Sequence, residues 1–186
     1  MKTETRRNKL PPYLTSNNDI FAIIADRVKS QDKGCTVIVP HVCNNVDAFG
    51  AGFAGQVARN FPSVKADYHM LGKTFLKNNL GYTQFLKVYE EPKYRHKLIF
   101  ANMIAQNGIV SGNNPRPLNY LALTKCMVSI AKYISEQTDF MQKNEDVEIH
   151  APKFGSGLAG GNWNFISNLI EDIWSPYRTY IYTYQK

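Results

Sequence analysis

Residues 35–55 read CTVIVPHVCNNVDAFGAGFAG, and this stretch predicts a buried strand, a glycine-rich loop and the start of a helix. Cys35–Val42 is short, apolar and rich in β-branched residues, which is typical of a strand inside a sheet, with Pro40 expected at its end. Gly50-Ala51-Gly52-Phe53-Ala54-Gly55 follows and leads into a helix expected over Phe53–Asn60. Because glycines accept positive φ values and lack Cβ atoms, the main-chain N–H groups of such a loop can close around an anion.

The same G-x-G-x-x-G pattern returns at Gly155-Ser156-Gly157-Leu158-Ala159-Gly160. It again lies between an expected strand, Val147–Ala151, and an expected helix, Asn164–Trp174. A helix N-terminus adds unpaired N–H groups and the positive end of a dipole. One copy alone is explained equally well by a tight turn of small residues. Two copies in the same context favour a site that holds both phosphates of a diphosphate.

Two familiar phosphate-binding motifs do not fit these loops. A Rossmann site needs an acidic residue about 20 positions beyond the glycines, at the end of the next strand. Glu90 and Glu91 come too late after the first loop, and the second loop is followed by the last expected strand. Neither loop continues with Gly-Lys-Ser/Thr, which excludes a P-loop. The interpretation that remains is a diphosphate ligand held by a fold other than the Rossmann scaffold of hydride-transfer enzymes.

Strands and helices are expected to alternate along the rest of the chain. The remaining expected elements are a helix capped within Ser16–Asp19, a helix from Ser63 toward Lys77, strands Thr83–Tyr89 and Lys97–Ile104, a helix from Leu118 to about Thr138 and a strand Arg178–Tyr184. Residues 105–117 form a long polar loop of the kind that is usually functional or mobile. Alternation favours an α/β fold with helices on both faces of a mixed sheet, and ligands of such sheets bind at the strand ends.

Composition and charge limit the classes of function. The 186 residues are 44% hydrophobic and 20% charged, which fits one globular domain, expected over residues 15–186 after a basic N-terminal arm at residues 1–14. No apolar run reaches membrane-spanning length, so no membrane partner is expected. The net charge of +7 fits an anionic partner. Because much of the excess lies in the arm, solvation explains it too, and nucleic acid is a less favoured partner.

The cysteines and histidines suggest no metal site. Three widely spaced cysteines, without a Cys/His ligand pattern, indicate reduced thiols in a cytoplasmic protein, and no cofactor is expected. Cys43 is interpreted as a buried filler rather than a nucleophile. His69 and His96 are expected at the surface, and His150 is expected to be structural.

Polar and aromatic residues flank the two loops. His41 can act as acid, base or nucleophile near neutral pH, although a histidine satisfied at a strand end explains it equally well. Asn44 and Asn45 can bind sugar hydroxyls without adding charge. Asp19 can accept a hydrogen bond from an exocyclic amine, or simply cap its helix. Four aromatic residues beside the loops either stack on a ligand or pack the loops: Phe49, Phe53, Phe154 and Trp163.

Together these residues resemble the macro domain family, which binds ADP-ribose, and in particular its branch of ADP-ribose 1''-phosphate phosphatases and small ADP-ribosyl hydrolases. The resemblance covers about residues 15–184. It rests on His41-x-Cys43-Asn44 before Gly50–Ala54, on Pro62 and Tyr68, on Asn102–Gln106, and on Pro152 with Gly155–Trp163.

The resemblance implies a three-layer α/β/α domain with a central mixed sheet of about six strands. It implies that Asp19 and Ile20 lie at the adenine end, and that Gly50–Ala54 and Gly155–Gly160 wrap the diphosphate and distal ribose, with Phe49 and Phe154 beside them. Asn44 would contact the distal ribose, and His41 would be the catalytic group. The implied partner is ADP-ribose, a derivative of it, or an ADP-ribosylated macromolecule.

Three departures from the family pattern bear on mechanism. The usual Gly-Asp-Ile opening is Asn18-Asp19-Ile20 here, and the stretch from it to His41 is longer than usual. A related branch uses a Lys and an Asp; Lys87 is a candidate for the first, although a lysine on a strand is usually edge decoration, and Ala159 stands at the second. Two hypotheses therefore stand: hydrolysis of a distal-ribose substituent, and binding of ADP-ribose without turnover. An ADP-ribosyl hydrolase acting on nucleic acid is the third.

Overall fold

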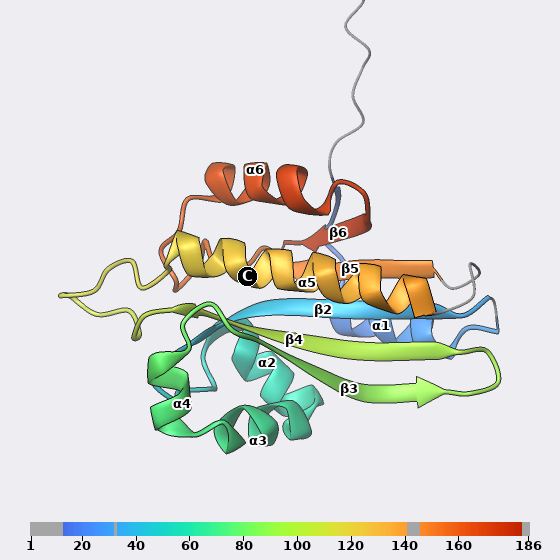
Figure 1. The fold of residues 1–186 in the computed structure, drawn as a ribbon, viewed down its shortest axis with the longest axis horizontal. Helices are drawn as coiled ribbons and strands as arrows, with labels where there is room; N and C mark the ends of the chain where they lie inside the picture. Colours follow the sequence, from blue (N-terminus) through green and yellow to red (C-terminus); the bar gives the residue numbers. More distant parts are fainter. Residues whose placement is uncertain (1–12, 32, 141–145, 184–186) are drawn as a thin grey trace, which may run out of the picture.

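A six-stranded mixed sheet forms the middle of the molecule. The computed structural model describes residues 13–31, 33–140 and 146–183 (Figure 1). The strand order is β1-β6-β5-β2-β4-β3, and every neighbouring pair is parallel except β3 and β4. The strands are β1 Leu14–Ser16, β2 Cys35–Asn44, β3 Thr83–Glu91, β4 His96–Gln106, β5 Asp146–Pro152 and β6 Arg178–Tyr182.

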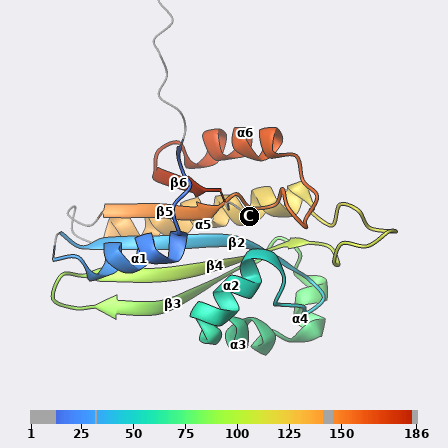
Figure 2. The same ribbon diagram turned by 180° about the vertical axis from the view of Figure 1, so that it is seen from behind.

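Helices cover both faces of the sheet. They are α1 Ile20–Lys29, α2 Gly52–Asn60, α3 Pro62–Met70, α4 Gly72–Asn78, α5 Tyr120–Phe140 and α6 Trp163–Trp174. Figure 1 shows α5 and α6 on the near face, and Figure 2, seen from behind, shows α1, α2 and α3 on the other. The expected three-layer α/β/α architecture with a mixed sheet of six strands is confirmed.

Two apolar clusters, one on each face, hold the layers together. Alternate residues of β2 enter different clusters: Ile38 packs toward α5 and α6, while Val37 and Val39 pack toward α1 and α2. This alternation follows from the two-residue repeat of a strand. Trp174, the last residue of α6, is fully buried. Its Nε1 donates a hydrogen bond to the carbonyl of Met127 in α5 at 3.0 Å.

Pro40 lies inside β2 rather than at its end, so that expectation is wrong. It pairs in register with Ala101 of β4. The pairing of β2 with β5 stops at Ile38, and beyond that point β2 pairs with β4 alone. At Pro40 the edge of β2 that faces β5 makes no hydrogen bonds between strands. A proline, which has no N–H group to donate, is therefore tolerated at this position.

Several element boundaries also differ from expectation. The helix expected from Ser63 to Lys77 is two helices, because Gly72 takes a φ of +76° between α3 and α4. Strand β1 was not expected; it begins at Leu14, and the preceding Tyr13 packs edge-on against Trp163. The other residues of the expected N-terminal arm, 1–12, lie outside the described residues.

A buried carboxylate joins helix α1 to strands β5 and β6. Glu148 of β5 is 4% exposed and forms ion pairs with Arg27 of α1 at 3.1 Å and with Arg178 of β6 at 3.0 Å. His150 Nε2 lies 3.1 Å from the same carboxylate, so His150 is structural, as expected. Burial alone would raise the pKa of Glu148, but the hydrogen bonds from His150, Arg27 and Arg178 lower it to about 2.

His96 was expected at the surface, and this is wrong. Its side chain is fully buried, with Nδ1 accepting from the Cys35 N–H at 3.2 Å and Nε2 3.0 Å from the Ser30 carbonyl. The imidazole thus ties the start of β4 to the start of β2. Within the part of the chain that the structure describes, no helix is long and apolar enough to cross a membrane.

We predict that Glu148→Gln lowers the free energy of unfolding by about 2–3 kcal/mol at pH 7, because two arginines lose a buried ionic partner. A carboxyl with a lowered folded-state pKa stabilises the fold above its unfolded pKa, and this contribution disappears as the pH falls from about 4.5 toward about 2. Urea unfolding at pH 7 and pH 3 should therefore show the gap between variant and wild type narrowing in acid.

Asp146→Asn is the matched control on the same strand. Asp146 pairs with Lys33 at 3.5 Å, and both side chains are about half exposed. Removing this charge should change stability by less than about 0.5 kcal/mol. Equal losses in the two variants, or a Glu148→Gln loss that does not depend on pH, would contradict the prediction.

Candidate functional site

A cleft of about 820 Å³ opens at the edge of the sheet where the parallel strands end. It is bordered by the last residues of β2, β4, β5 and β6, by both glycine loops and by the start of α1. This is the place where α/β sheets bind their ligands. The predicted site residues all border the cleft, except Ser156 and Gly160.

The two glycine loops meet in this cleft. Gly52 has a φ of +56°, and a Cβ atom placed on it would lie 3.5 Å from Cδ1 of Leu158. The side chain of the second loop thus touches the backbone of the first. Segments more than 100 residues apart in the sequence form one continuous wall.

Main-chain donors without acceptors line this wall. Among the described residues, the N–H groups from Phe49 to Ala54, of Gly155 and from Gly157 to Ala159 have no hydrogen-bond acceptor in the protein. Helix α2 also has no side-chain cap, and its first intrahelical bond runs from Gly55 to Ala51. Since main-chain N–H groups in proteins are almost always paired, two such runs at one cleft require water or a ligand as acceptor.

Glycine is needed at different positions of the loops for different reasons. A Cβ on Gly55 would lie 2.4 Å from the Gly50 carbonyl oxygen, so the turn itself requires Gly55. Gly50 and Gly157 have neither a positive φ nor any atom within 4 Å of an added Cβ, and both border the cleft. The fold does not require glycine at these two positions, whereas a ligand lying against the backbone does.

Asn44 and Asn45 build the first loop. Asn44 Oδ1 accepts from the N–H groups of Val46 and Ala48 at 3.0 and 3.1 Å, and from the Tyr68 hydroxyl at 3.1 Å. Asn45 Oδ1 accepts from the Gly108 N–H at 2.8 Å, which ties this loop to the one after β4. Both side chains are thus engaged with the protein, and a contact of Asn44 with a sugar stays a prediction.

His41 lies at the bottom of the cleft and is 1% exposed. The rings of Phe49, Phe53 and Phe100 meet its imidazole at steep angles, with centroids 5.7 to 6.3 Å away. Burial lowers the pKa of His41 to about 4, although the Asn102 side chain opposes this fall. The imidazole is therefore neutral at pH 7, which suits a base or nucleophile and does not suit an acid.

Cys43 is a buried filler beside this imidazole. Its Sγ lies 3.7 Å from Nδ1 of His41, and it is 3% exposed. Burial raises the pKa of the thiol well above its ordinary value, so no thiolate forms near neutral pH.

The start of α1 supplies the other polar end of the cleft. Asp19 caps the helix through Oδ1, which accepts from the Phe21 N–H at 2.9 Å. Its second carboxylate oxygen has no partner among the described residues and can accept from a ligand. Ile20, Tyr182 and Thr183 complete this part of the lining.

The aromatic residues mainly pack the loops. Phe49 and Phe154 are 6% and 4% exposed, and Phe53 stacks on Phe21 with the ring centroids 5.4 Å apart. Trp163 does not border the cleft. Ser156 and Gly160 also face elsewhere: the Ser156 hydroxyl donates to the Lys153 carbonyl, and the Gly160 N–H donates to the Gly157 carbonyl. Their contact with a ligand stays a prediction.

Lys87 does not belong to this site. It lies on the edge strand β3, is half exposed and forms an ion pair with Glu90. This is the edge position that a lysine on a strand usually takes. Sequence reasoning missed five residues at or just beyond the ends of β4 and β6 that line the cleft: Gln106, Ile109, Val110, Tyr182 and Thr183. The rule that parallel strands end at one edge would have found them.

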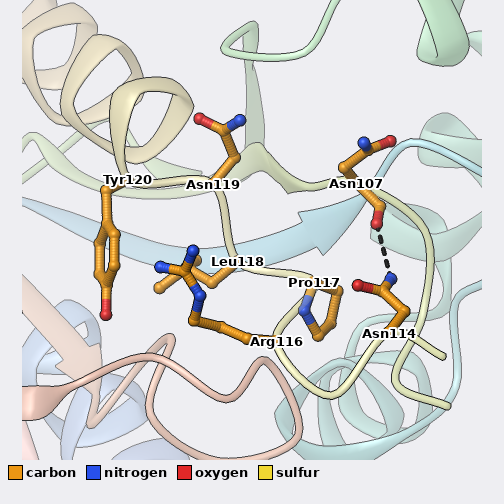
Figure 3. A pocket seen from close by; sticks show the side chains of 7 residues that line it. All are labelled: Asn107, Asn114, Arg116, Pro117, Leu118, Asn119 and Tyr120. Carbon is orange, nitrogen blue, oxygen red and sulfur yellow. Dashed lines mark hydrogen bonds between the residues drawn. The ribbon is translucent and has the colours of Figure 1, made fainter. Parts of the chain in front are cut away.

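A second, smaller pocket of about 240 Å³ lies at the base of the loop before α5 (Figure 3). Asn114 Nδ2 donates to the Asn107 carbonyl at 3.0 Å, and the Arg116 guanidinium lies over the Tyr120 ring, 5.0 Å from its centroid. These groups satisfy one another within the loop. The larger cleft, with its unpaired donors, is therefore the candidate site.

Curated proteins resemble this chain over most of its length. An uncharacterized 17.5 kDa protein of Enterobacteria phage T4 is 26% identical over 135 residues, covering 72% of this chain and 77% of that protein. An ADP-ribose 1''-phosphate phosphatase of Candida albicans is 23% identical over 140 residues, covering 75% and 83%. No family model matches the sequence.

Solved structures share the fold. A protein of unknown function from Bacteroides thetaiotaomicron has a TM-score of 0.72 at 26% identity, covering 94% of this chain and 99% of that one. DarTG of Thermosipho africanus, solved with ADP-ribose, has a TM-score of 0.60 at 16% identity, covering 78% of this chain and 37% of that one. A macrodomain protein from Streptomyces coelicolor has a TM-score of 0.61 at 29% identity, covering 86% and 95%. The likeness spans most of this chain and nearly the whole of the Streptomyces coelicolor macrodomain protein, so this protein has the fold of the macro domains.

Proposed function

We propose that the cleft binds ADP-ribose, with the diphosphate held by the main-chain N–H groups of the two glycine loops. The observation that carries this proposal is the pair of donor groups, Phe49–Ala54 in the first loop and Gly155 with Gly157–Ala159 in the second, which have no acceptor within the described part of the protein. Macro domains of similar fold have been solved with ADP-ribose or ADP. A nucleoside diphosphate sugar supplies the acceptors that these donors need.

Main-chain dipoles, rather than side-chain charges, neutralise the diphosphate in this proposal. Lys153 and Asp19 are the charged side chains that border the cleft among the described residues, apart from the neutral His41. The Lys153 ammonium lies 5.2 Å from the centroid of the Trp163 ring, which does not border the cleft. The uncapped N-terminus of α2 and the neighbouring amides therefore supply most of the positive potential. The free oxygen of Asp19 accepts from the exocyclic amine of adenine.

We further propose that the protein hydrolyses a phosphate from C1'' of the distal ribose. A water molecule attacks phosphorus, neutral His41 accepts the proton of that water, and the bond from phosphorus to the ribose oxygen breaks. The ribose oxygen takes up a proton from solvent water and the His41 imidazolium releases its proton to solvent, which gives ADP-ribose, inorganic phosphate and the neutral imidazole again. Two proteins of similar sequence carry the name ADP-ribose 1''-phosphate phosphatase. For this reaction Phe49 or Phe53 must move from the imidazole when substrate binds.

Binding without turnover is the second candidate. It is favoured by the 1% exposure of His41 and by the three rings that cover its imidazole. Ala159, at the position where a related branch has an acid, also leaves the second loop without a carboxylate. In this case the same cleft holds ADP-ribose as a recognition site.

We predict that Gly50→Ala and Gly157→Ala each weaken ADP-ribose binding at least tenfold, about 1.4 kcal/mol, because a methyl group occupies space that the diphosphate needs. Both sites accept a Cβ without contact within the protein, so the melting temperature should stay within about 2 °C of wild type. Isothermal titration calorimetry and thermal unfolding measure the two effects.

Gly112→Ala is the matched control. Gly112 also has open space around an added Cβ and no positive φ, but it lies in the loop before α5 and does not border the cleft. Its substitution should leave both affinity and stability unchanged. Unaltered ADP-ribose affinity in Gly50→Ala and Gly157→Ala would refute the proposal that these loops hold the diphosphate.

We predict that His41→Gln abolishes phosphate release from ADP-ribose 1''-phosphate and keeps ADP-ribose affinity within about threefold, because glutamine is a polar side chain of similar length that cannot serve as a base. In the wild type, kcat should fall as the pH drops toward about 4, where the imidazole takes up a proton. A malachite-green assay of released phosphate between pH 4 and 8 measures both effects. If the wild type releases no phosphate, the hydrolysis proposal is refuted and the binding function remains. If His41→Gln releases phosphate at the wild-type rate, His41 is not the base.

A further inference from the structure

A row of three polar side chains crosses the middle of the sheet beneath α3. His41 of β2 pairs in register with Asn102 of β4, which pairs in register with Gln84 of β3. The three residues are 1%, 0% and 9% exposed. Their neighbours on these strands are mostly apolar, so the row is a polar line through the core that starts at the cleft and ends at α3.

The hydrogen bond of Gln84, at the end of the row away from the cleft, sets the orientation of both amides in the row. Gln84 Nε2 donates to the carbonyl oxygen of Asp67 in α3 at 2.9 Å. A carbonyl oxygen accepts and never donates, so the amide of Gln84 cannot be turned around. Its Oε1 consequently points back along the row and accepts from Asn102 Nδ2 at 3.0 Å. This leaves Asn102 Oδ1, an acceptor, for His41.

Two buried atoms of the row still lack a partner with good geometry. They are Nε2 of His41 and Oδ1 of Asn102. They belong to residues paired across neighbouring strands, and the Asn102 side chain acts on the imidazole by opposing the fall of its pKa. A hydrogen bond between them satisfies both atoms at once if Nε2 carries the proton.

We propose that Asn102 and Gln84 are positioning residues that fix His41 as the Nε2–H tautomer, so that Nδ1 keeps its lone pair. The carbonyl of Asp67 sets this choice through two amides across three strands. Nδ1 faces Cys43 Sγ at 3.7 Å, near the cleft, and is the nitrogen that accepts the proton in the proposed hydrolysis. The role of Nδ1 in the reaction rests on the proposed function, whereas the tautomer itself does not.

Nitrogen NMR of the full chain, with uniformly ¹⁵N-labelled protein, reads the tautomer directly. At pH 7 the expected result is one protonated nitrogen, Nε2, and one unprotonated nitrogen, Nδ1, each at the shift of a single form. The reverse assignment, or two averaged shifts in the wild type, would overturn the proposal without any variant.

Gln84→Met tests whether the far end of the row sets the tautomer. Methionine has a similar length and cannot orient the amide of Asn102, so that amide is free to turn its Nδ2 toward His41. The two nitrogen shifts of His41 should then move toward their average. Asn102→Asp should raise the titration midpoint of His41, because a carboxylate favours the charged imidazole. Unchanged shifts in folded Gln84→Met would refute the proposal.

Thr36→Val is the matched control. Thr36 also lies on β2, is 4% exposed and has an unpartnered buried Oγ1, but it lies outside the row. Its removal should change neither the His41 shifts nor their titration. If Asn102→Asp does not fold, Gln84→Met and the wild-type spectrum still decide the question.

Activity separates this inference from the proposed function. Where phosphate is released, Gln84→Met should lower kcat in proportion to the fraction of imidazole that leaves the Nε2–H form, about twofold for an even mixture, and leave KM unchanged. The expected tautomer together with no phosphate release would end the hydrolysis proposal and leave the row intact. Phosphate release by a wild type whose Nδ1 carries the proton would refute the proposed tautomer and leave the hydrolysis proposal standing.

Discussion

The structure of the site depends on main-chain N–H groups that the fold leaves without acceptors at one edge of the sheet. Parallel strands bring the ends of β2, β5 and β6 to that edge, and a glycine loop follows both β2 and β5. Leu158 against Gly52 joins the two loops into one wall. Because clustered donors are unfavourable when unpaired, two runs of them at one cleft need an acceptor, and this need is the basis on which we propose a diphosphate ligand.

Much of this could be predicted because repetition is visible in a sequence. Neither glycine loop means much alone, but the same spacing after two expected strands predicts one shared anion site. The buried run at Cys35–Val42 and the long helix after residue 117 likewise depend on local pattern, and both are present as β2 and α5. The six-stranded sheet follows from the alternation of such elements.

The errors have a common physical cause, which is dependence on partners distant in the sequence. Pro40 is tolerated inside β2 because β5 stops pairing at Ile38, and no local pattern encodes that. His96 is buried because the Cys35 N–H at the start of β2 and the Ser30 carbonyl at the end of α1 meet its imidazole. Lys87 matches the family pattern by residue type, yet β3 is an edge strand and carries its side chain to solvent.

His41 shows how both of its sequence interpretations can be true together. As a histidine buried near a strand end, it lies beneath three aromatic rings and pairs in register with Asn102 of the neighbouring strand. As a candidate base, it borders the cleft with a neutral imidazole. Burial makes these roles compatible, because the same desolvation that keeps the imidazole uncharged also protects the lone pair of a base from water. In the hydrolysis that we propose, the stability lost by placing polar groups in the core is the cost of holding one nitrogen of His41 ready, and the aromatic rings have to move before a substrate can reach it.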